Sequence, residues 1–243
     1  MKTTFGHAAL VLLFALFAGA VECRADDDLQ ALLTWQAGTT VSASAVNQYG
    51  EDRCFTAIAI PDGVWQRMQG KTYQPNPTVK RSDLRYLKVL HWDHDNRIHI
   101  GEMVCNATIA QVLVDVFREL YKMKYPIERM LLPDVYDADD ERQMRDNNTS
   151  CFCYRVVAGS KVLSKHALGL AVDLNPLYNP YVKVRKDGTV FVQPSTGKPF
   201  ADRKKYNRYL IDRNDPAYRL FIKKGFKWGG DWKNVKDYQH FEY

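Results

Sequence analysis

The 243-residue sequence contains few of the features that mark unusual classes of protein. Its 10 prolines and 14 glycines are too few for a collagen-like or low-complexity chain, and no internal repeat is visible. The fractions of hydrophobic (46%), charged (26%) and aromatic (12%) residues exclude a largely disordered chain. Beyond one short N-terminal run, no stretch is apolar enough to resemble a membrane span. The length suits one elaborated globular domain, or one domain with a small appendage.

The one long apolar run covers residues 8–21 and follows a positive charge at Lys2. Its 14 residues are fewer than the about 20 that an ordinary spanning helix needs. Small residues at 18–20 and 23–25 offer cleavage sites after Ala20 or Ala25, so residues 1–25 are typical of a secretory signal peptide. An N-terminal membrane anchor is the alternative. We expect an exported protein, periplasmic or extracellular and associated with the cell wall, with no membrane span after signal removal.

Cysteine is also scarce. Removal of residues 1–25 leaves four cysteines: Cys54, Cys105, Cys151 and Cys153. In an oxidising compartment these allow three pairings, which spacing alone does not resolve. The single residue between Cys151 and Cys153 would strain a disulfide, so the sequence favours a Cys54–Cys105 bridge. The Cys-x-Cys pair could also be half of a zinc site, but no second cysteine pair lies near it in the sequence.

Positive charge is concentrated in one segment. The formal net charge is +6, and residues 183–236 alone carry 15 Lys and Arg against five Asp and Glu. Two interpretations fit: a solvated basic surface, or a basic lobe that faces an acidic polymer. Nucleic acid is the usual acidic partner of such a segment. The export signal instead favours an extracytoplasmic polymer such as a cell wall, so we expect no nucleic-acid partner.

Patterning predicts a modest set of secondary-structure elements. Residues 26–64 have weak patterning and are interpreted as an N-terminal extension. Strands are predicted over 84–90 and 98–104, paired through the polar turn at 94–97. Apolar residues at helical spacing predict a helix over 106–124, and a Pro after an Asp cap predicts another over 215–225. Short strands that alternate irregularly with helices indicate the α+β class.

Two segments carry residues suited to metal chemistry, at 164–173 and 237–242. A catalytic zinc site needs three protein ligands of nitrogen or oxygen type and one open position for water. His166, Asp173 and His240 could supply the three ligands. Asp237, three residues before His240, could take the proton from the bound water. Spacing alone does not establish such a site, since a histidine near a strand is more often simply hydrogen-bonded.

Several motifs resemble one known family. They are Ser-x-His-x-x-Gly-x-Ala-x-Asp at 164–173, Asp-x-x-His at 237–240, Asn-Asn-Thr-Ser-x-Phe-x-x-Arg at 147–155, Asp-x-Asn-Pro at 173–176, Asn-Pro-Tyr at 179–181, and Gly-Phe-x-Trp-Gly-Gly-x-Trp at 225–232. Together they resemble the D-Ala-D-Ala carboxypeptidase family of zinc peptidases. That family includes vancomycin-resistance D,D-peptidases and the L-alanyl-D-glutamate endopeptidases of phage lysins. The resemblance extends over residues 65–243, which we expect to form the zinc peptidase domain.

The resemblance implies a hedgehog-type fold, with a small antiparallel sheet flanked by helices and zinc on the sheet face. It implies one Zn²⁺ per chain, held by His166, Asp173 and His240. Asp237 would be the general base. Arg155 would polarise the scissile carbonyl or hold a substrate carboxylate, since a guanidinium stays charged and offers a planar fork of donors. Ser164 would position substrate or the loop that carries His166.

The resemblance and the export signal predict an exported zinc metallopeptidase that hydrolyses peptide bonds in peptidoglycan stem peptides. The alternative is a catalytically silent, zinc-containing wall-binding module on the same fold. The presence of Asp237 favours the enzyme, because a binding module needs no base. A nucleic-acid-binding protein would depend on the basic segment alone. The sequence leaves open which stem-peptide bond is cut, whether the enzyme is an endopeptidase or a carboxypeptidase, and the oligomeric state.

Two further polar clusters offer weaker hypotheses. His91, His94 and His99, with Asp93 and Asp95, could hold a metal, but they flank a predicted turn and favour a solvated loop. The acidic residues between 134 and 140 suggest calcium, yet their spacing lacks the glycine and terminal glutamate of an EF-hand loop.

Overall fold

The computed structural model describes residues 26–157 and 161–243. The predicted signal peptide, residues 1–25, lies outside the described residues. Within the described part of the chain, no helix is both long and apolar enough to cross a membrane.

The N-terminal half is built on a four-stranded antiparallel sheet of order β1-β4-β3-β2. Its strands are β1 (Thr40–Val41), β2 (Thr56–Ile58), β3 (Leu84–Trp92) and β4 (Ile98–Asn106). β3 and β4 pair along their whole length, which confirms the two strands and the turn that the sequence predicts. The Asp93 carboxylate closes this turn, because its Oδ1 accepts hydrogen bonds from the backbone N–H groups of Asp95 and Arg97.

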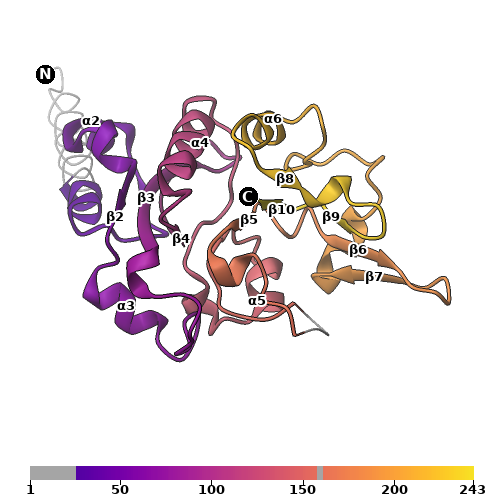
Figure 1. The fold of residues 1–243 in the computed structure, drawn as a ribbon. Coiled ribbons are helices and arrows are strands. Elements are labelled where there is room, and N and C mark those ends of the chain that lie inside the picture. The colour runs from indigo at the N-terminus through magenta and orange to yellow at the C-terminus, as the bar shows by residue number, and fades with distance from the viewer. Residues whose placement is uncertain (1–25, 158–160) are drawn as a thin grey trace, which may run out of the picture.

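The predicted amphipathic helix is α4 (Ala110–Lys122), which packs against β3 (Figure 1). Its fully buried side chains include Leu113, Val116, Phe117 and Leu120, the apolar set expected from helical spacing. The helix begins four residues later than predicted because Asn106 still belongs to β4. The second predicted helix is α6 (Pro216–Lys223).

The segment 26–64 is folded and contributes to the same core. Residues 26–34 are helical, and they are followed by β1, α2 (Ala43–Tyr49), the 3-10 helix η1 (Glu51–Cys54), β2 and the start of α3 (Asp62–Met68). Leu32, Ala45 and Val46 are almost fully buried in the cluster that also contains β3, β4 and α4. Elements this short offer too few residues for a clear periodic pattern, which explains the weak signal in the sequence.

The expected Cys54–Cys105 disulfide is absent, and all four described cysteines are free and buried. The expected disulfide was wrong, and strand register explains why Cys54 and Cys105 do not meet. Thr56 is opposite Lys88, which is opposite Glu102, so Cys54 and Cys105 extend away from this line in opposite directions. Cys105 lies three residues beyond Glu102, and this offset by itself is roughly 10 Å along the strand. A disulfide needs Cα atoms within roughly 7 Å.

The C-terminal half contains two three-stranded antiparallel sheets of order β5-β10-β8 and β7-β6-β9. Their strands are β5 (Ala171–Asp173), β6 (Tyr181–Val184), β7 (Val190–Gln193), β8 (Lys227–Trp228), β9 (Lys236–Asp237) and β10 (His240–Glu242). The remaining elements are α5 (Asp140–Arg145) and the 3-10 helices η2 (Arg81–Asp83), η3 (Pro133–Tyr136), η4 (His166–Leu168), η5 (Ser195–Phe200) and η6 (Gly229–Asp231). The structure is therefore α+β with small antiparallel sheets and several helices, as predicted.

The two halves meet through α4 and α6, as Figure 1 shows. Phe117 of α4 lies edge-on to Phe221 of α6, and Phe221 stacks on Phe241 of β10 at 4.4 Å between ring centroids. All three rings are essentially fully buried. Strand β10, which carries His240, is thus anchored to the main core.

Candidate metal centre

Strand pairing brings together two of the three predicted ligands. Asp173 ends β5 and His240 begins β10, and the two residues are direct partners in the antiparallel ladder. Directly opposite residues place their side chains on the same face of a sheet. His166 approaches this pair from η4, whose last turn is followed by Gly169 at φ +67°. A Cβ at Gly169 would lie 2.6 Å from the backbone nitrogen of Asn106, so only glycine permits this turn against β4.

The three side chains form a compact triangle of ligand atoms. His166 Nε2 lies 3.1 Å from Asp173 Oδ2, and His240 Nδ1 lies 3.1 Å from Asp173 Oδ1. The two ring nitrogens are also 3.1 Å apart. A tetrahedral zinc site with bonds of about 2.05 Å places neighbouring ligand atoms about 3.3 Å apart. The observed spacing therefore fits a zinc ion. Within residues 26–157 and 161–243, this is the one cluster of three or more His, Cys, Asp or Glu ligand atoms close enough to hold a metal.

The outer nitrogen of each imidazole is also engaged. His166 Nδ1 donates to the carbonyl oxygen of Cys151 at 2.7 Å, and His240 Nε2 lies 3.5 Å from Glu242 Oε2. A carbonyl oxygen can only accept, so Nδ1 of His166 carries a hydrogen, and Nε2 is the ring nitrogen that faces the centre. Outer partners of this type orient metal-binding histidines and raise their basicity. Glu242 was missed in the sequence, although it shares a strand face with His240 at a spacing of two residues.

The electrostatics of the centre favour bound positive charge. Burial raises the pKa of Asp173, but the two imidazoles outweigh this effect and hold its pKa well below the usual range. Burial lowers the pKa of His240, while the hydrogen bonds to Asp173 and Glu242 raise it to about 10. In the protein without metal, a proton on His240 therefore compensates the surrounding carboxylates. A divalent cation can take over that role, so the donor set suits zinc in both geometry and charge.

Asp237 lies beside the triangle without belonging to it. It sits on β9, and it lines the same cavity as the three candidate ligands. Burial raises the pKa of Asp237 to about 6, against the lowering effect of His240. Its Oδ1 is buried and has no hydrogen-bond partner in the described part of the chain. A buried carboxylate oxygen without a partner is costly for stability, which is a common property of functional groups.

Gly229 allows the strands of Asp237 and His240 to approach η6. A Cβ at Gly229 would lie 2.6 Å from the carbonyl oxygen of Asp237 and 2.8 Å from its Cβ. It would also lie 3.2 Å from the Cβ of His240. Both residues therefore keep their positions only because residue 229 has no side chain. Close packing therefore explains why the first residue of the Gly-Gly pair in the C-terminal motif is a glycine.

Arg155 and Ser164 both line the cavity next to the triangle. Arg155 Nε lies 2.8 Å from Asp140 Oδ2, an ion pair that fixes the guanidinium to α5. Ser164 Oγ accepts a hydrogen bond from the backbone nitrogen of His166 at 3.2 Å. Ser164 therefore supports the loop that carries His166, one of the two roles considered for it. Asp140 was missed as the partner of Arg155, because the two residues are distant in sequence.

The cavity that contains these residues has a volume of about 680 Å³. The three candidate ligands lie in its wall together with Asp237, and Trp232 lies beside them with its ring 5.2 Å from that of His240. Five residues of the β6–β7 hairpin also line the cavity: Tyr181, Lys183, Arg185, Phe191 and Gln193. A cavity of this size accommodates several residues of a peptide.

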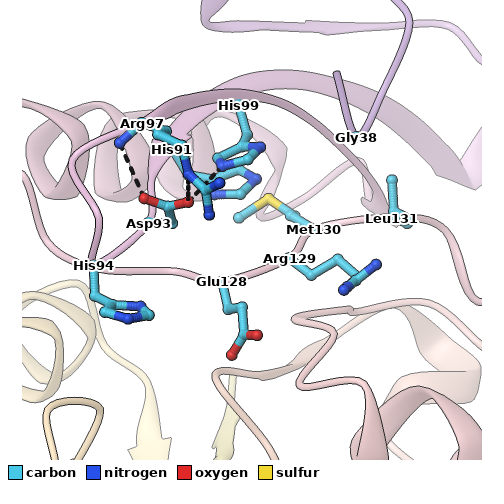
Figure 2. Close-up of a pocket in the computed structure, with 10 residues that line it drawn as sticks. All are labelled: Gly38, His91, Asp93, His94, Arg97, His99, Glu128, Arg129, Met130 and Leu131. Carbon is cyan, nitrogen blue, oxygen red and sulfur yellow. Dashed lines mark hydrogen bonds and ion pairs between the residues drawn. The ribbon is translucent and has the colours of Figure 1, made fainter. Parts of the chain in front are cut away.

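The His91 cluster lines a second, smaller cavity of about 180 Å³ (Figure 2). The expectation of a solvated loop is wrong for His91 and Asp93, which are 3% and 4% exposed. Figure 2 shows the Asp93 carboxylate between Arg97 and the histidines, and Asp93 Oδ2 lies 2.7 Å from Arg97 Nε and 2.9 Å from His99 Nε2. These contacts stabilise the β3–β4 turn, and the side chains do not form a metal-binding group in the described residues.

Comparison with known proteins supports the family that the motifs suggest. Residues 158–243, about the C-terminal third of the chain, match the family model described as D-alanyl-D-alanine carboxypeptidase. The match contains His166, Asp173, His240 and Asp237, whereas Arg155 lies just before it. No curated protein and no solved structure gives a significant match. The comparison supports a peptidase of this family.

Proposed function

We propose that the protein is an exported zinc metallopeptidase that hydrolyses peptide bonds in peptidoglycan stem peptides. The observation that carries this proposal is the triangle of His166, Asp173 and His240, with edges of 3.1 Å, beside the buried Asp237 carboxylate, whose Oδ1 has no hydrogen-bond partner in the described residues. The family match supports the peptidase class. We further propose that the fold is of the hedgehog type, with zinc on the face of the β5-β10-β8 sheet.

The chain would hold one Zn²⁺ per molecule through His166 Nε2, His240 Nδ1 and the Asp173 carboxylate. A zinc ion in such a site lowers the pKa of a bound water to about 7 and polarises a carbonyl oxygen. Cys151 and Glu242 would keep the two imidazoles oriented with a lone pair toward the metal.

Asp237 would act as the general base. Its Oδ1 has no competing hydrogen bond in the described residues, so it is available to accept the proton of the attacking water. Its pKa of about 6 lies between that of an exposed carboxylic acid and that of a protonated amine, which suits a group that must accept a proton and then release it. The proton would pass to the nitrogen of the leaving amine.

Arg155 would contribute positive charge to the same cavity. Its ion pair with Asp140 holds the guanidinium in place, so little conformational entropy is lost when a substrate binds. A substrate carboxylate or the scissile carbonyl oxygen would be its partner. Ser164 would act through the loop of His166.

The test compares two neighbours that should fail differently. Asp237→Asn should keep the zinc content of the wild type and lose about 10²–10⁴-fold in hydrolysis rate, because an amide cannot accept the proton. His240→Ala should lose both zinc and activity, because one of three ligands is removed. Zinc is measured by elemental analysis, and hydrolysis by mass spectrometry of products from cell-wall sacculi and stem peptides.

Asp231→Asn is the matched control for the removal of an acidic group near the C-terminus. Asp231 is exposed, pairs with Arg213 and does not line the cavity, so this variant should keep both zinc and activity. Wild-type activity of Asp237→Asn would refute the role of the base. A zinc-loaded wild type that cuts no stem peptide would instead favour the silent wall-binding module.

A further inference from the structure

We propose that the β6–β7 hairpin selects substrates that carry a free carboxylate, which Lys183 and Arg185 bind two to four residues from the scissile bond. The inference rests on the proposed peptidase function and deepens it, because it names the chemistry that the substrate must have. We call the five hairpin residues that line the cavity the hairpin wall: Tyr181, Lys183, Arg185, Phe191 and Gln193.

Strand register explains why the hairpin wall is polar. Tyr181 is opposite Gln193 and Lys183 is opposite Phe191, so these side chains share one face of the hairpin. The other face carries four valines: Val182, Val184, Val190 and Val192. Val184 and Val190 are 65% and 53% exposed. A hairpin that covers a core normally turns its apolar face inward. Here the charged face is turned toward the cavity, which indicates a polar occupant.

Two of the cations that line the cavity, Lys183 and Arg185, have neither an ion pair nor a hydrogen bond from the charged group in the described residues. Four Lys and Arg residues line it. Arg155 is ion-paired with Asp140, and Lys165 donates a hydrogen bond to the main-chain oxygen of Tyr243. In the described part of the chain, neither Lys183 nor Arg185 has an ion-pair partner. The cavity therefore offers two unpaired positive charges to an incoming ligand.

Arg185 is held in place by the aromatic side chains of the hairpin wall. Its Cζ lies 5.1 Å from the centroid of the Phe191 ring, and Phe191 lies edge-on to Tyr181 at 6.2 Å. A guanidinium stacked on an aromatic ring keeps its N–H groups free at the edge. Those donors suit the two oxygens of a carboxylate, the anionic group that peptides carry.

The hairpin wall lies directly beside the strand that carries the base. Tyr181 is the ladder partner of Asp237 in the β7-β6-β9 sheet. Lys183 and Arg185 follow two and four residues later, which is about 7 Å and about 13 Å along the strand. An extended peptide advances about 3.3–3.6 Å per residue. A substrate carboxylate two to four residues from the bond near Asp237 would therefore meet these cations.

The experiment uses two stem peptides with the same scissile bond, one with a free glutamate carboxylate and one with that carboxylate amidated. The wild type should show a KM about tenfold lower for the acidic peptide, as two partly exposed charge-assisted contacts allow. Lys183→Gln combined with Arg185→Gln should raise the KM of the acidic peptide to that of the amidated one. The matched control combines Lys186→Gln with Lys198→Gln, which removes two exposed charges outside the cavity and should keep the preference.

Equal KM values for the two peptides in the wild type, or a preference that survives the Lys183 and Arg185 substitutions, would overturn the inference. Calorimetric binding of the same peptides to the wild type and both double variants is measured in parallel. If the wild type cuts neither peptide, the proposed peptidase function fails, but the binding data still test the inference. Tighter binding of the acidic peptide that depends on Lys183 and Arg185 would support the inference. Equal affinities for the two peptides would refute the inference.

Discussion

Gly229→Ala is the substitution that tests most directly how closely the centre is packed. The added Cβ would lie 2.6 Å from the Asp237 carbonyl oxygen and 3.2 Å from the His240 Cβ. Ordinary contacts of a Cβ begin at 3.4 Å, so β9 must retreat by roughly 0.8 Å. Neither contact is with the far end of a flexible side chain. The shift therefore moves the base and one ligand together.

Two effects of this shift can be measured. Overpacking of this kind typically costs about 1–3 kcal/mol of unfolding free energy, which urea denaturation resolves. A displacement of about 1 Å in a catalytic group can cost about 100-fold in rate, which stem-peptide hydrolysis would detect. Elemental analysis shows whether the displaced His240 still retains zinc.

Gly63→Ala is the matched control. Gly63 lies in α3, and no atom lies within 4 Å of the position that its Cβ would occupy. Alanine favours the helix more than glycine does, so this variant should be as stable as the wild type or up to about 1 kcal/mol more stable. If Gly229→Ala matched the wild type in both stability and rate, the close approach of η6 to Asp237 and His240 would have no functional importance.

Three further predictions concern the second contact layer, the thiols and the pH dependence of stability. Glu242→Gln should lower zinc affinity by about 10–100-fold in chelator competition, because His240 loses its charged outer partner; unchanged affinity would remove Glu242 from the centre. The chain without residues 1–25 should resist a thiol reagent while folded, because burial raises the pKa of Cys54 to about 12 and that of Cys153 to about 12. When this chain is unfolded without reductant, all four thiols should react. Fewer than four thiols would restore the disulfide hypothesis. Burial raises the pKa of Asp215 from 3.8 to about 6, so the folded protein binds its proton more tightly than the unfolded chain. The free energy of unfolding should then fall as the pH rises from about 4 to about 6. Asp215→Asn, which can still cap α6, should lack this contribution, and a wild-type pH profile in that variant would contradict the assignment.

Elements with a local signal can be predicted from the sequence without a structure. The β3–β4 hairpin and α4 follow from alternation and helical spacing that extend over nine and 13 residues, and α6 follows from its Asp-Pro start. The candidate ligands and Asp237 were found because motif resemblance fixes residue types at defined spacing. These features depend on residues close together in the sequence, so they can be predicted without a tertiary structure.

Features that depend on the register between distant segments become visible only in the folded chain. The pairing of Asp173 with His240 places two ligands on one face, and the pairing of Tyr181 with Asp237 brings the hairpin wall to the base. Register also separates Cys54 from Cys105 and so removes the disulfide that cysteine counting favoured. Residues 26–64 join the core through elements too short to leave a periodic pattern. Contacts between residues tens of positions apart depend on how the chain packs as a whole, and neither residue of such a pair carries that information alone.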